Sequence, residues 1–233
     1  MAHYPPYDPG VHPPYRFEAL PAAVARAPLR PLYPLERTLS ELTGPVFSEN
    51  DVAAGENDLT QASGGQPIGQ VIVVQGQVLA DGRPVANSLV EIWQANAAGR
   101  YVHAADQSER ALDPNFHGAG RCVTDADGRY RFRTIKPAPY PGGGAPDWWR
   151  PAHIHFSCFG ASFMSRMVTQ MYFPGDPLIE PDRILGAIPD EAARRRLVAR
   201  LTPDVGERNR TLGYTFDIVL RGRNDTPFEG ASA

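Results

Sequence analysis

The chain changes from an irregular, proline-rich pattern to a strand-like pattern at about residue 66. The first segment, MAHYPPYDPGVHPPY, carries five prolines in its 15 residues, which favours extended or polyproline conformation. It is more aromatic than a typical disordered tail. The aromatic residues of this segment and of the residues that follow it include Tyr4, Tyr7, Tyr15, Phe17 and Tyr33. We therefore predict an N-terminal arm over residues 1–65 that contacts another subunit, with a short helix near 39–43, and a folded domain over residues 66–233.

Apolar and polar positions in the folded domain favour short strands. Leu89, Glu91 and Trp93 fall on one face of such a strand, and the residues between them fall on the other. Asp-Gly pairs supply tight turns between strands. The predicted strands span residues 71–79, 88–94, 121–124, 129–135, 153–159, 167–173 and 214–221. Many short strands with Gly- and Pro-rich turns predict an all-β fold, a β-sandwich with long loops.

One helix is predicted at residues 190–201, where an apolar stripe recurs with helical spacing. The stripe consists of Ala193, Leu197, Val198 and Leu201. Apolar runs are shorter than the roughly 20 residues of a membrane helix, and no secretory signal is evident. The net charge of -3 and the pI of about 6.1 suggest no nucleic-acid partner. Two cysteines argue against a disulfide framework and fit a reducing, cytoplasmic compartment.

Two of the six histidines, His153 and His155, stand one residue apart in the apolar run WRPAHIHF. Residues i and i+2 of a strand point to the same face, so the two imidazoles are expected to project together. Such a pair can bind a metal ion. It can also be satisfied by other hydrogen bonds, and the spacing alone leaves both interpretations open.

The remaining ligands decide which metal such a pair would bind. An Fe(II) site of two histidines and one carboxylate needs an acid, and only Asp147 precedes the strand closely. A zinc site favours cysteines, but Cys158 has odd spacing from His155 and should face away. Tyr140 in PAPYPGGG and Tyr101 in NAAGRYVH could supply hard, anionic oxygens that favour Fe(III). Either tyrosine alone is better explained by packing or a simple hydrogen bond.

Several segments together resemble the intradiol ring-cleaving dioxygenases. They are AGRY, LDPNFHGAGRCVTDADGRYRFRTIKPAPYP, WRPAHIHF, TQMYFPGDPL and YTFDIVLRG, with TGPVFS near Thr43. The likeness covers residues 66–228, and it is specific because the order, spacing and flanking residues of the motifs agree. It implies a catalytic β-sandwich domain with a prealbumin-like Greek-key core, one or two short helices, and one non-haem Fe(III) ion per chain.

The resemblance also implies the metal ligands. Tyr140 and His153 would bind Fe(III) as an axial pair, and Tyr101 and His155 would bind it equatorially. Tyr140 would have a catalytic role as well, by leaving the metal and taking a proton from the substrate.

Three further residues match positions near the substrate in this family. Arg150 would stabilise negative charge on the activated substrate, and Gln170 would lie near the substrate and the iron, so both are expected to bind the substrate and to assist catalysis. Ile184 would form part of the substrate pocket wall.

The reaction implied by the resemblance is cleavage of protocatechuate (3,4-dihydroxybenzoate) with O2 to 3-carboxy-cis,cis-muconate, within the β-ketoadipate route of aromatic catabolism. Catechol, hydroxyquinol or another substituted catechol is the alternative substrate. The implied partner is an alpha chain that lacks the iron ligands and forms αβ units in a higher oligomer. No nucleic acid or membrane is expected as a partner.

One position departs from the family pattern. Beta-type chains usually have a tryptophan two residues after the axial tyrosine, whereas this chain has Gly142. Trp148 or Trp149 is a candidate replacement for that aromatic wall. The departure leaves the choice among catechol substrates open.

Two alternative functions from other classes of protein are compatible with parts of the sequence. The stretches VIVVQGQVLADGRPVANSLVEIW and CVTDADGRYRFRTI also resemble prealbumin-like modules that bind or space without a metal. Such a module has no use for Tyr140 and two histidines beside Arg150. A zinc or copper hydrolase with the same histidine pair would need a carboxylate base and a third ligand, which the sequence lacks.

Overall fold

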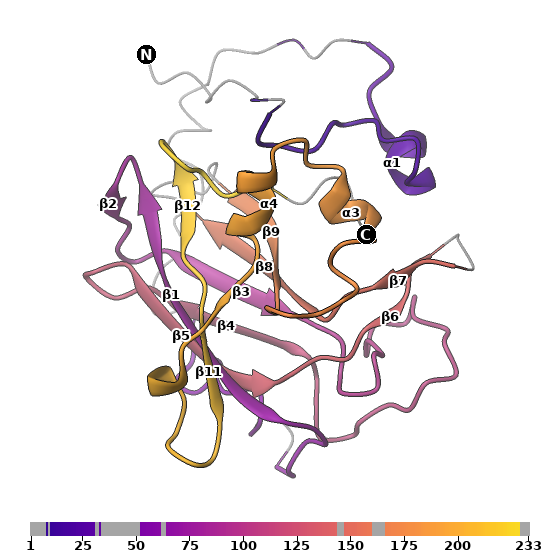
Figure 1. Cartoon of the computed structure of the whole chain (residues 1–233). Helices are drawn as coiled ribbons and strands as arrows, with labels where there is room; N and C mark the ends of the chain where they lie inside the picture. Colours follow the sequence, from indigo (N-terminus) through magenta and orange to yellow (C-terminus); the bar gives the residue numbers. More distant parts are fainter. Residues whose placement is uncertain are drawn as a thin grey trace.

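The structure is a computed structural model that describes residues 8, 10–30, 33, 52–61, 64–143, 147–159 and 166–228. Figure 1 shows strands in the body of the molecule, the short α-helices at the top and a short 3-10 helix at the lower left. The elements in chain order are α1 (Pro21–Arg26), β1 (Val71–Ala80), β2 (Arg83–Pro84), β3 (Leu89–Trp93), β4 (Ala119–Val123), β5 (Arg129–Ile135), β6 (Tyr140–Pro141), β7 (Trp149–Arg150), β8 (His153–Phe159), β9 (Arg166–Tyr172), α3 (Arg183–Gly186), α4 (Glu191–Arg196), β10 (Arg200–Leu201), the 3-10 turn η2 (Pro203–Val205), β11 (Leu212–Thr215) and β12 (Ile218–Arg221). None of the described helices is long and apolar enough to cross a bilayer.

Two sheets form the sandwich. The first has the order β10-β11-β1-β12, with β2 and β5 also paired to β1, and the second has the order β4-β3-β8-β9. Strand β1 pairs antiparallel with β5 and parallel with β11 and β12. Strands β6 and β7 form a separate two-stranded ribbon. The all-β sandwich predicted from the sequence is confirmed.

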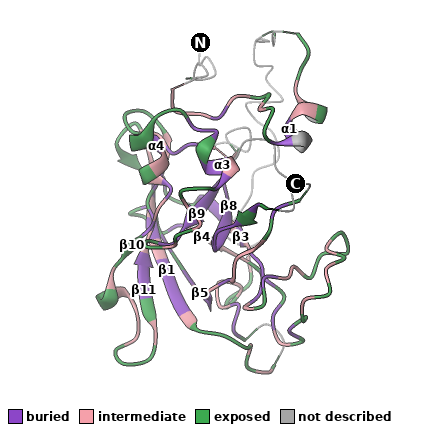
Figure 2. Ribbon diagram, turned by 45° about the vertical axis from the view of Figure 1, so that its right-hand side comes forward, coloured by how far each residue is buried: buried purple, intermediate pink, exposed green. Residues whose placement is uncertain are grey.

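The core lies between the two sheets. Ile72 and Phe132 come from the first sheet, Ile92 and Phe156 come from the second, and all four belong to one buried cluster. Every residue of β8 is buried, on both faces of the strand. Figure 2 shows β8 and β9 among the buried strands near the centre of the molecule. The face of β8 that points away from the core is therefore also enclosed, which makes it suited to hold a site.

The predicted strands are present to within two residues, except for the strand expected at 214–221. That segment is two strands, β11 and β12, separated at Phe216 and Asp217. Here the Tyr130 hydroxyl donates a hydrogen bond to the Phe216 carbonyl, and the backbone amide of Gln77 donates one to Asp217 Oδ1 at 3.1 Å. The single-strand prediction was wrong because side-chain hydrogen bonds replace the regular backbone pairing at the break: the Tyr130 hydroxyl bonds the Phe216 carbonyl, and the Asp217 carboxylate bonds the Gln77 backbone amide.

The helix predicted at 190–201 is also corrected. Helix α4 covers only Glu191–Arg196, with Asp190 as an N-cap that accepts from two backbone amides. After Leu197 the chain pairs with Tyr172: the Tyr172 amide donates to the Leu197 carbonyl at 2.8 Å, and Ala199 donates back at 2.9 Å. Pairing with a distant strand therefore ends the helix, and the segment continues into β10.

Gly76 lies in β1 beside the break between β11 and β12. A Cβ atom added there would overlap the Phe216 carbonyl and lie 2.8 Å from the Tyr130 hydroxyl. We expect Gly76→Ala to lower the free energy of unfolding by about 3 kcal/mol, because backbone cannot move aside without breaking the pairing. Urea unfolding followed by circular dichroism measures this. Gly186→Ala is the control, since nothing lies within 4 Å of its added Cβ. An unchanged midpoint for Gly76→Ala would contradict the expectation.

Described residues of the predicted arm pack against the sandwich. Leu59 is almost fully buried in the main core, and Leu20, just before α1, forms a second cluster with Trp148 and Ile184. The helix predicted near 39–43 lies outside the described residues. The domain boundary at residue 65 and the contact with another subunit stay predictions.

Candidate metal centre

Strand β8 presents His153 and His155 on the same face, as the strand period predicts. Their ring centroids are 4.9 Å apart, and both side chains are buried. Strands β3 and β9 pair with β8 on either side, which fixes its backbone. Trp93 of β3 lies opposite His155 and stacks on its ring, with centroids 4.9 Å apart and planes 4° apart. The two imidazoles are thus held rigidly.

His153 has a defined tautomer. Its Nδ1 lies 2.7 Å from the Pro151 carbonyl oxygen, which can only accept, so Nδ1 carries the proton and Nε2 presents a lone pair. Burial, followed by the positive charges of Arg150 and of His155 when protonated, holds the pKa of His153 well below its ordinary value. A neutral imidazole whose Nε2 carries a lone pair rather than a proton is the form that binds a metal ion.

Tyr140 reaches the histidines through the β6–β7 ribbon. This ribbon places Tyr140 directly opposite Arg150, three residues before His153. The Tyr140 hydroxyl oxygen lies 3.1 Å from His153 Nε2. The guanidinium carbon of Arg110 lies 5.9 Å from the centroid of the Tyr140 ring, so a second cation stands beside the phenol.

Tyr101 is brought to the same place by the loop after β3. Gly99 turns this loop with a φ of 76°, and any side chain there would overlap the Pro139 carbonyl beside Tyr140. The Tyr101 amide donates to Asp106 Oδ2 at 2.9 Å. As a result, the Tyr101 hydroxyl lies 3.1 Å from His155 Nε2 and 3.4 Å from the Tyr140 hydroxyl.

Two phenol oxygens and two imidazole nitrogens therefore form a connected cluster of four donor atoms. Adjacent donors around an ion with bonds of about 2.1 Å stand about 3 Å apart, so these spacings fit a single ion. No group of three or more His, Cys, Asp or Glu residues that could hold a metal occurs among the described residues. The residue types here match a hard trivalent cation better than zinc or Fe(II).

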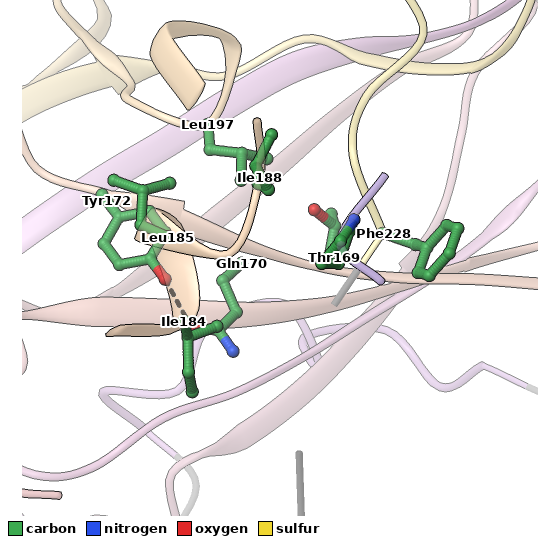
Figure 3. Close-up of a pocket in the computed structure, with 9 residues that line it drawn as sticks. Thr169, Gln170, Tyr172, Ile184, Leu185, Ile188, Leu197 and Phe228 are labelled. Atoms are coloured by element: carbon green, nitrogen blue, oxygen red, sulfur yellow. Dashed lines mark hydrogen bonds between the residues drawn. The ribbon is translucent and has the colours of Figure 1, made fainter. Parts of the chain in front are cut away.

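Arg150 and Gln170 lie next to this cluster in a buried network. Gln170 is opposite His155, and Tyr172 is opposite His153, in the β8–β9 pair. One Nη of Arg150 donates to Gln170 Oε1, and the same nitrogen lies 3.3 Å from the Tyr172 hydroxyl. Figure 3 shows the Tyr172 hydroxyl hydrogen-bonded to Gln170, at 3.0 Å.

The amide nitrogen of Gln170 is buried and has no hydrogen-bond partner among the described residues. Because a buried donor without a partner is costly, this nitrogen is suited to meet a group that is brought into the site. Ile184 lies in α3 and lines a cavity of about 10 Å³ together with Gln170 and Tyr172 (Figure 3). The structure thus brings all seven predicted site residues to one region.

Trp148 occupies the space beside Gly142. A Cβ atom added at Gly142 would overlap the Trp148 indole ring, and the Gly142 amide donates to the Trp148 carbonyl at 2.8 Å. Trp148 is buried, whereas Trp149 is 46% exposed. Of the two candidate replacements for the missing aromatic wall, Trp148 is therefore the one that lies against this position.

Sequence reasoning missed four residues around the site. Trp93 and Tyr172 could have been found from strand pairing, because each lies opposite a histidine in a neighbouring strand. Arg110 lies just before the segment that begins LDPNF, and Asp182 lies just after TQMYFPGDPL, both in loops where no local pattern marks them.

The chain matches known proteins over most of its length. The dioxygenase family matches residues 42–222. The protocatechuate 3,4-dioxygenase beta chain of Burkholderia cepacia is 55% identical over 229 residues, which cover 97% of this chain and 95% of that protein.

More distant relatives match a smaller part. Hydroxyquinol 1,2-dioxygenase of Rhizobium sp. (strain MTP-10005) is 36% identical over 132 residues, which cover 51% of this chain and 42% of that protein. The crystal structure of catechol 1,2-dioxygenase from Pseudomonas arvilla C-1 superposes with a TM-score of 0.51 at 27% identity, over 71% of this chain and 55% of that chain. Taken with the match across residues 42–222 and the near-full-length relative, these findings establish that the chain belongs to the intradiol dioxygenase family.

Proposed function

We propose that this chain is the catalytic subunit of an Fe(III) dioxygenase that cleaves protocatechuate between its two hydroxyl-bearing carbons to give 3-carboxy-cis,cis-muconate. The observation that carries the proposal is the convergence of Tyr101, Tyr140, His153 and His155, whose donor atoms stand 3.1–3.4 Å from their neighbours. These four residues would hold one Fe(III) ion. A spacer or binding module of similar fold has no use for this donor set.

The site supports the chemistry that such an ion brings. Bound Fe(III) would act as a Lewis acid that lowers the pKa of the catechol hydroxyls and withdraws electron density from the ring. The Tyr140 oxygen, as a phenolate, would accept one hydroxyl proton of the substrate, so it serves as a base as well as a ligand. The hydrogen bond from His153 Nδ1 to the Pro151 carbonyl keeps Nε2 available as a ligand throughout.

Arg150 and Gln170 supply the electrostatic part of the mechanism. Arg150 is permanently charged and buried, so its attraction for negative charge on the ring is weakly screened by water. The unpartnered amide nitrogen of Gln170 would donate to an oxygen of the bound substrate or of a reaction intermediate. Ile184 would bound the pocket on the α3 side.

Protocatechuate is proposed as the substrate because the beta chain of protocatechuate 3,4-dioxygenase matches this chain over nearly its full length. Hydroxyquinol and catechol are the competing substrates, since enzymes named for them match about half of the chain. Steady-state rates with the three catechols, measured at equal concentration, decide between them. The proposal requires the highest kcat/KM with protocatechuate.

We propose that this chain works in a hetero-oligomer, because the relative that matches it over nearly its full length is a beta chain. An alpha chain would complete αβ units, and residues 1–65 of this chain would contact a neighbouring subunit, while residues 66–233 form the catalytic domain. A cytoplasmic setting is proposed because both cysteines are free thiols, as is usual in a reducing compartment.

The visible absorption spectrum tests the metal and the substrate class together. We expect the chain, purified with its alpha-type partner, to be red-brown from tyrosinate-to-Fe(III) charge transfer. Anaerobic addition of protocatechuate should shift the band to longer wavelength. A band without a shift would keep the iron but point to another catechol. A colourless protein with full metal occupancy would overturn the Fe(III)–tyrosinate proposal.

A further inference from the structure

Asp182 is a buried carboxylate in the loop that leads into α3. Its side chain has no exposed surface, and it lies ten residues beyond the end of β9. An unpaired carboxylate is very costly to bury, so its surroundings must supply compensating donors. The donors that it contacts show what this charge is used for.

Both oxygens of Asp182 accept hydrogen bonds from elements around the site. Oδ1 accepts from Arg150 Nε at 3.1 Å and from the Trp148 indole nitrogen at 3.2 Å. Oδ2 accepts from the Tyr172 hydroxyl at 3.1 Å and from the Leu185 amide at 3.2 Å. One carboxylate therefore ties β7, β9 and α3 to each other.

These contacts close a ring of hydrogen bonds around the Arg150 guanidinium. Asp182 Oδ1 accepts a hydrogen bond from Arg150 Nε, and Gln170 Oε1 accepts one from an Nη of the same guanidinium. Tyr172 lies between the two acceptors: its hydroxyl is 3.0 Å from Gln170 Oε1 and 3.1 Å from Asp182 Oδ2, and its single proton can be donated to one of them at a time. A guanidinium is planar, so fixing two of its nitrogens fixes the plane and the direction of its charge.

We propose that Asp182 is the residue that positions Arg150 for catalysis. This role rests on the proposed function, because Asp182 would orient the arginine that faces the substrate in that reaction. Asp182 touches neither the substrate nor the metal ligands in this scheme, so it acts through Arg150. It also holds Trp148 against Gly142, and so fixes the aromatic wall of the same pocket.

Asp182 has a second role as the N-cap of α3, through its contact with the Leu185 amide. The two roles can be separated by substitution. Asparagine and serine are both good N-caps, so Asp182→Asn and Asp182→Ser keep the cap while removing the negative charge beside Arg150. A loss of activity in these variants is then a loss of positioning rather than of the helix start.

The test is a double-mutant cycle in the iron-loaded complex, with protocatechuate as substrate. We expect Asp182→Asn to lower kcat about 100-fold, as a displacement of about 1 Å in a positioned group does, while the iron content and the charge-transfer band stay as in the unmodified complex. In an Arg150→Ala background the same substitution should lower kcat less than twofold, because the group that it positions is gone. Asp182→Ser should follow Asp182→Asn in both backgrounds.

Asp147→Asn is the matched control. Asp147 is exposed and pairs with Arg183 at 3.3 Å, so its substitution removes an aspartate ion pair nearby without touching Arg150. We expect its kcat to be unchanged. Should Asp182→Asn fail to fold, Asp182→Ser and Tyr172→Phe carry the same cycle, since each removes one member of the ring of hydrogen bonds.

Each outcome decides one proposal. An equal fractional loss of kcat in both backgrounds would show that Asp182 only supports the fold, and unchanged kcat in a folded Asp182→Asn complex would show that it does not position Arg150. Either result overturns the inference and leaves the proposed function intact. An unmodified complex that lacks the charge-transfer band and ring cleavage would instead overturn the proposed function.

Discussion

Tyr140→Phe is expected to retain iron and to lower kcat by about 10²- to 10⁴-fold, the range that a general base contributes. The substitution removes one of the four donor atoms, a phenol oxygen, while those of Tyr101, His153 and His155 remain. It also removes the group that would take a proton from the substrate. Iron content measured by atomic emission, together with stopped-flow rates of ring cleavage, separates the two consequences.

The visible spectrum adds a second readout for this variant. With one tyrosinate in place of two, the charge-transfer band should change in position and intensity but persist. Tyr130→Phe is the control, because Tyr130 is a buried tyrosine of the core, and among the described residues its hydroxyl donates to the Phe216 carbonyl, away from the metal centre. Full activity in iron-loaded Tyr140→Phe would show that Tyr140 is not the proton acceptor.

Arg150→Ala is expected to lower kcat by about 10²- to 10³-fold with the charge-transfer band retained, as for removal of one preorganised group that stabilises developing charge. The reason is that Arg150 is buried beside the site, and after burial its positive charge is the largest cause that lowers the pKa of His153. Arg150→Lys keeps the positive charge but loses the planar guanidinium, so its kcat should lie between that of the unmodified complex and that of Arg150→Ala.

The same substitution has an expected effect on stability. Removing Arg150 leaves Asp182 as a buried charge without its ion-pair partner, which costs about 3–5 kcal/mol. Thermal unfolding of the variant measures this loss. Arg129→Ala, an exposed arginine on β5, serves as the control with little expected change. Loss of iron from Arg150→Ala, rather than loss of rate, would assign the arginine a structural role at the metal centre.

The sequence by itself determined most of the sheet. Strand positions such as 129–135 follow from a period of two, because a strand turns alternate residues to opposite faces whatever its partner is. The strand at 153–159 is buried on both faces, so its apolar run rather than an alternation marks it. The same period predicted that His153 and His155 share a face. The residues themselves left Tyr101 and Tyr140 as open candidates, and only the likeness to the intradiol family assigned them to the same metal ion as the histidines.

Tertiary structure decided what depends on contacts between distant segments. The helix expected at 190–201 ends early because Leu197 and Ala199 pair with Tyr172, and the strand expected at 214–221 divides at Phe216 because Tyr130 bonds its carbonyl. Local propensity carries no information about such partners. Asp182 belongs to the same class: only the folded chain places its carboxylate between Arg150 and Tyr172, and its burial there gives it a role that its sequence position does not show.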